Sequence, residues 1–203
     1  MEKIKNNPGL LSSSAVLGLV CLLAAAICGA VYGVMSPYIQ QKQAYAVATA
    51  YASLTGDFTG SCEQLEVDGD YTDVIKNITF YYDSDGNAEG CIFHVSAGSG
   101  SGYVEFLLKL SAGKEKNDML VSQTALISSN EAGAGISSLE EKSFFNRLLG
   151  HSYSEYLSLE GLSSNDGGAI KAIDGARSFC EDIIESVNII FTYYRFFISE
   201  ESL

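Results

Sequence analysis

Residues 75–95, IKNITFYYDSDGNAEGCIFHV, contain two strand-like runs that are separated by a short polar segment. Residues 75–82 and 91–95 are rich in β-branched and aromatic side chains, which favour strands. The five residues 83–87 between them contain the Asp-Gly pair that is typical of tight turns. The sequence therefore predicts a β-hairpin, and with it an antiparallel sheet.

Further strands and helices are expected downstream of this hairpin. Residues 103–110 (YVEFLLKL) and 120–127 (LVSQTALI) predict two more strands, and residues 139–149 predict a short amphipathic helix. Apolar residues then recur at three- and four-residue steps from residue 170 to residue 194, which predicts one long helix with an apolar face. Asn165 and Asp166 are expected to cap its start. Strands followed by helices predict an α+β fold.

The residues before the hairpin predict a membrane anchor. No charged residue occurs from position 6 to position 41, and residues 15–35 read AVLGLVCLLAAAICGAVYGVM. At about 1.5 Å per residue, this run reaches roughly 30 Å, the thickness of a hydrocarbon core. The alternative is a cleaved secretory signal, but the apolar part of such a signal is usually only about 7–15 residues long. Residues 40–54 predict a helical stalk that ends near Gly56, and its expected role is spacing.

Charge predicts the orientation of the anchor. Lys3 and Lys5 precede the span, and cytoplasmic flanks tend to carry basic residues. We therefore expect residues 1–35 to form a cytoplasmic tip and an anchor in the cell membrane, residues 36–56 a stalk, and residues 57–203 an extracytoplasmic domain. The net charge of −13 excludes a nucleic-acid binder, which needs a basic face.

Catalytic constellations are not apparent in the sequence. His94 and His151 are not spaced with Cys or carboxylates in the way that metal ligands are. The three cysteines after the anchor allow at most one disulfide, for which Cys62 and Cys91 are a candidate pair.

Two Gly-containing stretches are candidate ligand sites. One is residues 130–135 (NEAGAG), and the other is residues 166–170 (DGGAI), at the expected start of the long helix. Glycine lets a ligand approach the backbone, and a helix N-terminus attracts phosphate, as does a cation such as Lys171. The alternative is that both stretches are ordinary turns.

The order of these features resembles the FMN-binding domain of membrane redox complexes, most closely the single-span, FMN-carrying subunit of the Rnf-type ion-translocating electron transport complex. The resemblance covers the anchor, the stalk, the hairpin and Gly102-Tyr103 before a strand. The family's E-T-P-G-L-G loop is matched by residues 131–135 with one residue fewer. Its S-G-A-T motif, in which the Thr carries FMN through a phosphoester, aligns with residues 167–170.

The resemblance implies one set of cofactor-binding residues: Glu131, Gly133, Gly135, Gly167, Gly168, Ala169, Ile170 and Lys171. Ile170 has no hydroxyl group, so a phosphoester cannot form there, and any FMN is expected to be held without a covalent bond. Two functions follow. The chain is either an electron-transport subunit whose partners are the other subunits of an Rnf-like complex, or a flavin-free paralogue that acts as a structural or interaction module at the membrane surface.

Overall fold

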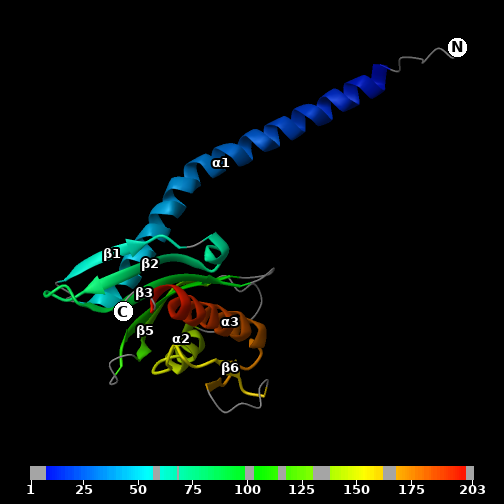
Figure 1. Cartoon of the computed structure of the whole chain (residues 1–203). Coiled ribbons are helices and arrows are strands. Elements are labelled where there is room, and N and C mark those ends of the chain that lie inside the picture. Colours follow the sequence, from blue (N-terminus) through cyan, green and yellow to red (C-terminus); the bar gives the residue numbers. More distant parts are fainter. Residues whose placement is uncertain are drawn as a thin grey trace. The chain divides into compact units, whose positions relative to one another are not determined.

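A computed structural model of the chain describes residues 8–56, 60–67, 69–98, 103–113, 118–129, 138–161 and 168–199; in residues 8–15 and 138–141 it defines the helix but not the side chains. The chain divides into two compact units, Met1–Tyr45 and Ala46–Leu203. The elements in chain order are α1 (Pro8–Thr55), β1 (Ser61–Leu65), a 3-10 turn (Gly69–Tyr71), β2 (Ile75–Tyr82), β3 (Ala88–Ala97), β4 (Val104–Ala112), β5 (Met119–Ser129), α2 (Ser138–Arg147), β6 (Ser158–Leu159), β7 (Ala169–Ile170), α3 (Arg177–Tyr193) and a π-helical turn (Tyr194–Ile198) (Figure 1).

The first unit consists of the N-terminal part of α1. Residues from Val16 onward in α1 are apolar enough, and the helix is long enough, to cross a membrane. Large apolar side chains on this part of the helix, such as Leu22 and Val34, are 71% and 73% exposed. Such exposure suits a lipid environment and is costly in water. Pro37 lies inside α1, where its ring removes one backbone hydrogen bond.

The second unit is an antiparallel sheet with helices, which confirms the α+β fold. Strands β1 to β5 lie in sequence order, and every neighbouring pair is antiparallel. The expected hairpin is formed by β2 and β3. Its turn is held by Asp83, whose Oδ1 accepts the backbone N–H groups of Asp85 and Asn87 at 2.8 Å each. Gly86 has a φ of +83°, a conformation that glycine adopts without strain.

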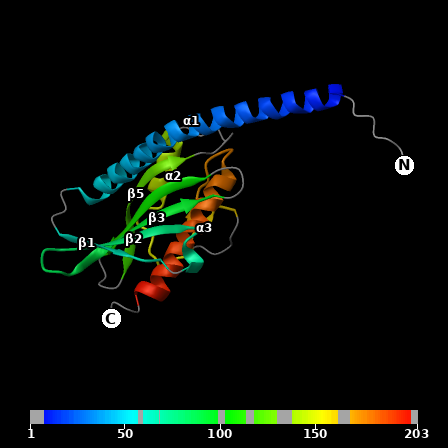
Figure 2. The same ribbon diagram turned by 90° about the horizontal axis from the view of Figure 1, so that it is seen from above.

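One face of the sheet is covered by α2 and α3. Figure 1 shows both helices on the same side of the sheet, and the view in Figure 2 shows α3 running beneath the strands. The core on this face is built from fully buried side chains, among them Phe93, Phe106, Phe144, Phe179 and Ile183.

The other face is covered by the end of α1. Ala50 and Leu54, one helical turn apart, are buried with Ile92 and Leu107 of the sheet. Because both faces are covered, adjacent residues of β3 are buried in succession, rather than alternating with exposed ones. The last turns of α1 are therefore part of the domain core, which differs from the expected spacer role of the stalk.

The ends of the expected elements agree with the structure in most places. Helix α1 stops at Gly56, whose N–H donates to the carbonyl of Ala52 and whose φ is +55°, as in a glycine C-cap. The expected strands near residues 103–110 and 120–127 are β4 and β5, and the expected short helix is α2.

The candidate disulfide between Cys62 and Cys91 is wrong. Both residues are free thiols, and they lie on nonadjacent strands and on opposite faces of the sheet.

Helix α3 begins seven residues later than expected. Residues 169 and 170 form β7, and α3 starts at Arg177. Ala176 is its N-cap and makes no side-chain capping bond, while the expected caps Asn165 and Asp166 lie outside the described residues. The prediction that residues 166–170 open the long helix is therefore wrong.

Candidate functional site

The site is built around β6, a two-residue strand that pairs with β7. The pairing is parallel, with Ser158 opposite Ala169 and Leu159 opposite Ile170. Ser158 N–H donates to the carbonyl of Gly168 at 3.2 Å, and Glu160 N–H donates to the carbonyl of Ile170 at 2.9 Å. These bonds place the segment with the expected Gly-rich motif directly beside residues 157–160.

Gly168 is at a position where a larger residue would not fit. Its φ is +80°, and a Cβ atom built there would lie 2.9 Å from the side chain of Leu157. The glycine therefore serves the packing of β7 against the residue before β6.

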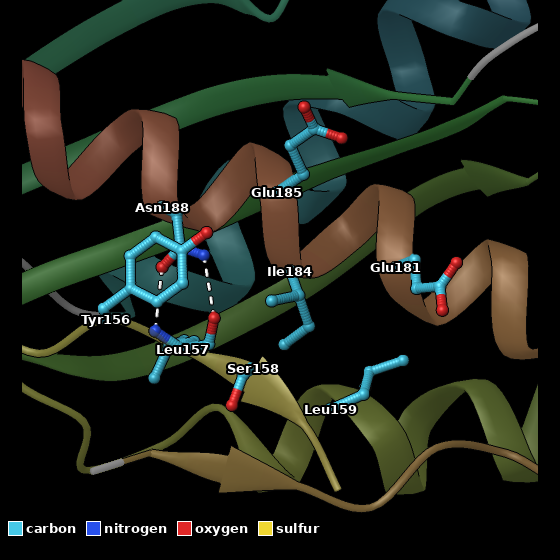
Figure 3. Close-up of a pocket in the computed structure, with 8 residues that line it drawn as sticks. All are labelled: Tyr156, Leu157, Ser158, Leu159, Glu181, Ile184, Glu185 and Asn188. Carbon is cyan, nitrogen blue, oxygen red and sulfur yellow. Dashed lines mark hydrogen bonds between the residues drawn. The ribbon is translucent and has the colours of Figure 1, made fainter. Parts of the chain in front are cut away.

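Helix α3 forms the opposite wall through Asn188. Its side-chain carboxamide makes two hydrogen bonds with the backbone of Leu157: Leu157 N–H donates to Oδ1, and Nδ2 donates to the Leu157 carbonyl, both at 2.9 Å (Figure 3). The amide thus takes the place that a neighbouring strand would occupy. Residues 157 and 188 are 31 positions apart in the chain, so this contact fixes the spacing between β6 and α3.

A pocket of about 320 Å³ lies between these walls. This volume is at the lower end of the range of about 300–1,000 Å³ that is typical of small-ligand sites. Its lining consists of the segment 156–159 and one side of α3: Tyr156, Leu157, Ser158, Leu159, Glu181, Ile184, Glu185 and Asn188 (Figure 3).

The charge of the pocket is negative. Glu181 and Glu185 are one turn apart on α3, and none of the eight lining residues is Lys, Arg or His. Arg177 Nε lies 2.9 Å from Glu181 Oε1, so that carboxylate is partly neutralised, while Glu185 has no ion-pair partner in the described part of the chain. A mouth of this charge repels phosphate and attracts cations.

The expected cofactor-binding residues that the structure describes do not form a phosphate site. Ile170 is 2% exposed and belongs to the core on the α3 face of the sheet. Lys171 is exposed, and its carbonyl accepts a hydrogen bond from Arg147 Nη1. Gly168 and Ala169 lie in or beside β7, away from any helix start. Glu131, Gly133, Gly135 and Gly167 lie outside the described residues.

Sequence reasoning missed the Gly-Ala pair that does precede α3. Gly175, with a φ of +81°, and Ala176 come directly before Arg177, the first residue of the helix. Asp174-Gly175-Ala176-Arg177 thus occupies the place relative to the helix where the resemblance expects S-G-A-T. The signal is present as a second Gly-Ala in the sequence, but the apolar spacing of Ile170 and Ile173 assigns that stretch to the helix interior.

Sequence reasoning also did not identify Asn188 and Tyr156 as residues of the candidate site. Asn188 interrupts an otherwise apolar helix between Val187 and Ile189, and such a polar residue at a half-buried position needs a partner. That partner, the backbone of Leu157, is distant in sequence and could not be identified without the fold. Tyr156 is 75% exposed and carries no pattern that marks it.

A second polar group lies on the other face of the sheet. His94 Nε2 is 2.7 Å from Glu105 Oε1, and Ser128 Oγ donates to Glu105 Oε2 at 3.2 Å. The serine contacts the carboxylate rather than the imidazole, so the histidine is not placed to activate it as a nucleophile. Among the described residues, no group of three or more metal-ligating side chains comes together.

The pocket beside β7 is not suited to the phosphate of FMN. That phosphate would need several N–H donors or a cation, whereas this pocket has two carboxylates and no cation in its lining. No protein-family model and no curated protein matches the chain.

Proposed function

We propose that this chain is a membrane-anchored interaction module without covalent flavin, and that its partners are the other subunits of an Rnf-like electron transport complex. The resemblance in sequence order supports the choice of complex. The N-terminus is proposed to be cytoplasmic and the domain extracytoplasmic, because Lys3 and Lys5 precede the span and residues 36–203 carry a net charge of −14.

One observation carries the proposal that the flavin is not attached. The residue aligned with the flavin-bearing Thr is Ile170, which has no hydroxyl and whose side chain is buried in the core. The alternative alignment, with the motif directly before α3, places Arg177 at that position, and this residue also has no hydroxyl. Neither alignment provides an oxygen that could form the phosphoester.

The absence of a covalent flavin is tested by in-gel fluorescence. The full chain is expressed in a host that has the flavin-transferring enzyme, together with a positive control that has a complete S-G-A-T motif. We expect a fluorescent band for the control and none for this chain after denaturation. A fluorescent band for this chain would contradict the proposal, and the Ser178→Ala variant would then show whether the hydroxyl next to Arg177 had been used.

The role as an interaction module is tested by affinity purification. The tagged full chain is extracted in mild detergent and the co-purifying membrane subunits are identified. We expect stoichiometric recovery of redox-complex subunits, because a module of this kind acts through its partners. Recovery of the chain alone under conditions that keep a known complex intact would refute the role.

A further inference from the structure

The two edges of the five-stranded sheet differ in how they are covered. At the β5 edge, residues 150–153 lie alongside the strand: Val121 N–H donates to the His151 carbonyl at 2.9 Å, and Gly150 N–H donates to the Val121 carbonyl at 2.8 Å. Strand β1 is the opposite edge, and each of its five residues is exposed (Figure 1, Figure 2). An exposed edge strand is a template on which a further strand can pair.

The outward backbone groups of β1 belong to Cys62 and Gln64. The N–H of Asp83, just after β2, donates on the side of β3. Bonding direction alternates along a strand, so Tyr82 bonds toward β1 and Ser61, opposite it, bonds back. The next residue, Cys62, therefore directs its N–H and C=O away from the sheet, and Gln64 does the same two residues later.

Strand β1 lacks the features that usually prevent an edge from pairing. Its sequence, SCEQL, has no Lys, Arg or Pro, and its register with β2 is continuous, without a bulge. Its one charged side chain is Glu63, whose Oε2 accepts a hydrogen bond from Tyr82 Oη at 3.2 Å. The carboxylate is thus held over the neighbouring strand β2 rather than directed across the edge.

The residues of β1 are complementary to a second copy of β1 in one antiparallel register. A two-fold axis at Cys62 places the two Cys62 residues opposite each other and Glu63 opposite Ser61. An axis at Glu63 would place two carboxylates opposite each other, which destabilises a strand pair. An axis at Gln64 would place Glu63 opposite the apolar Leu65. The register about Cys62 is therefore favoured.

We propose that β1 is a self-association surface, at which two copies of the chain pair as antiparallel strands about Cys62. The pairing is through backbone groups, and the Cys62 side chains stand on a face of the joined sheet. A short strand pair suffices, because α1 is long and apolar enough to cross a membrane and anchoring in one membrane raises the effective concentration of the copies. The inference does not rest on the proposed function, since self-association needs no other subunit.

The test is disulfide cross-linking of the full chain in isolated membranes. Cys21 and Cys28 are replaced by alanine, because both are exposed on α1, whereas Cys91 and Cys180 are buried and stay. The membranes are reduced, then oxidised with copper phenanthroline in air, and dimers are measured on a non-reducing gel. We expect a dimer through Cys62, since hydrogen-bonded antiparallel pairs have Cα atoms about 5.5 Å apart, within the range of disulfides.

A matched control moves the thiol by two residues. Cys62→Ser/Gln64→Cys places it at another exposed position on the same face of β1, where the proposed register separates the two thiols by about 13 Å along the strand. Such a separation is beyond the reach of a disulfide, so we expect about fivefold less dimer or lower. Random collisions would cross-link both positions alike.

A second pair of variants tests the backbone bonds, with Cys62 retained. Gln64→Pro removes one outward N–H and is expected to lower the dimer yield about fivefold or more, whereas Gln64→Ala keeps this N–H and should not lower it. Circular dichroism of each variant checks that it is folded.

Three results would overturn the inference. They are equal yields at the two thiol positions, equal yields for Gln64→Pro and Gln64→Ala, and a Cys62 thiol that forms no dimer or cross-links only to a different protein. The proposed function is tested separately, by the recovery of other subunits, and would stand if this inference failed.

Discussion

Tyr81 and Gly90 depend on each other across adjacent strands. They are opposite one another in the β2–β3 pair, and Tyr81 Oη donates to the carbonyl of Leu110 at 3.1 Å, which lies beyond Gly90 on β4. The tyrosine therefore passes over the glycine to reach its acceptor. A Cβ atom on Gly90 would lie 2.1 Å from that carbonyl oxygen and 2.3 Å from Oη.

Replacing Gly90 by alanine is expected to destabilise the domain by about 1–3 kcal/mol, because the crowded atoms include backbone that cannot move aside. The measurement is the free energy of unfolding of the full chain in detergent, followed by near-UV circular dichroism. Gly69→Ala is the matched control, since a Cβ atom there meets nothing within 4 Å, and its effect should be small. Equal stabilities of the two variants would contradict this account of Gly90.

Ionisation of the Tyr194 hydroxyl group makes the free energy of unfolding depend on pH in the alkaline range. Burial, with smaller contributions from Cys91 and Tyr153, raises the pKa of Tyr194 to about 12, from about 10 in the unfolded chain. The folded state therefore keeps the proton longer than the unfolded state does. The stabilising contribution is complete below about pH 10 and is lost as the pH rises toward about 12.

We expect the free energy of unfolding to fall between about pH 10 and pH 12, and to fall less steeply in Tyr194→Phe. Burial raises the pKa of Tyr81 in the same direction, so part of the decline remains in that variant. Tyr156→Phe removes a tyrosine that is already 75% exposed and should leave the decline as it is. Identical slopes for Tyr194→Phe and the unaltered chain would rule out this contribution.

Asn188 joins helix α3 to the segment at β6. Asn188→Leu would leave the N–H and C=O of Leu157 without partners at a residue that is 1% exposed. We expect a loss of about 1–3 kcal/mol in the free energy of unfolding. Thr192→Ala, one turn later on the exposed side of the helix, should change it by less than about 0.5 kcal/mol. Similar losses in both variants would mean that the two hydrogen bonds to Leu157 do not contribute to the free energy of unfolding.

The elements that could be predicted are those whose signals are local. The hairpin follows from β-forming side chains on both sides of an Asp-Gly turn, and α2 follows from its own apolar spacing. The two-residue strands β6 and β7 could not be predicted, because their pairing joins Ser158 to Ala169 across a loop. The late start of α3 has the same cause, since pairing with β6 draws Ile170 into a strand despite its helical spacing.

The candidate site was less predictable than the fold. Its walls come together only through long-range contacts, of which the bonds between Leu157 and Asn188 are the clearest. Ile170 was expected to be either a cofactor-binding residue or the first residue of an apolar helix face. Its burial confirms that it is a core residue, but it enters the core from β7 rather than from a helix.

The Cys62 thiol can be used to test on which side of the membrane the domain lies. Cys62 is exposed on β1, while Cys91 and Cys180 are buried, and Cys21 and Cys28 belong to the apolar part of α1. We expect a membrane-impermeant maleimide added to intact cells to label Cys62, and Cys62→Ser to abolish this labelling. Labelling that occurs only after the cells are opened would place the domain in the cytoplasm and contradict the proposed orientation.

The order in which the two faces of the sheet are covered has a consequence for biogenesis. The end of α1 precedes the strands in the chain, so the Ile92 and Leu107 face can be covered as soon as each strand pairs with its neighbour. The opposite face is covered in part by α2 and is completed only by α3, which is synthesised later. Until α3 has been synthesised, part of the apolar face of the completed meander is exposed, and such transiently exposed surface is prone to aggregation.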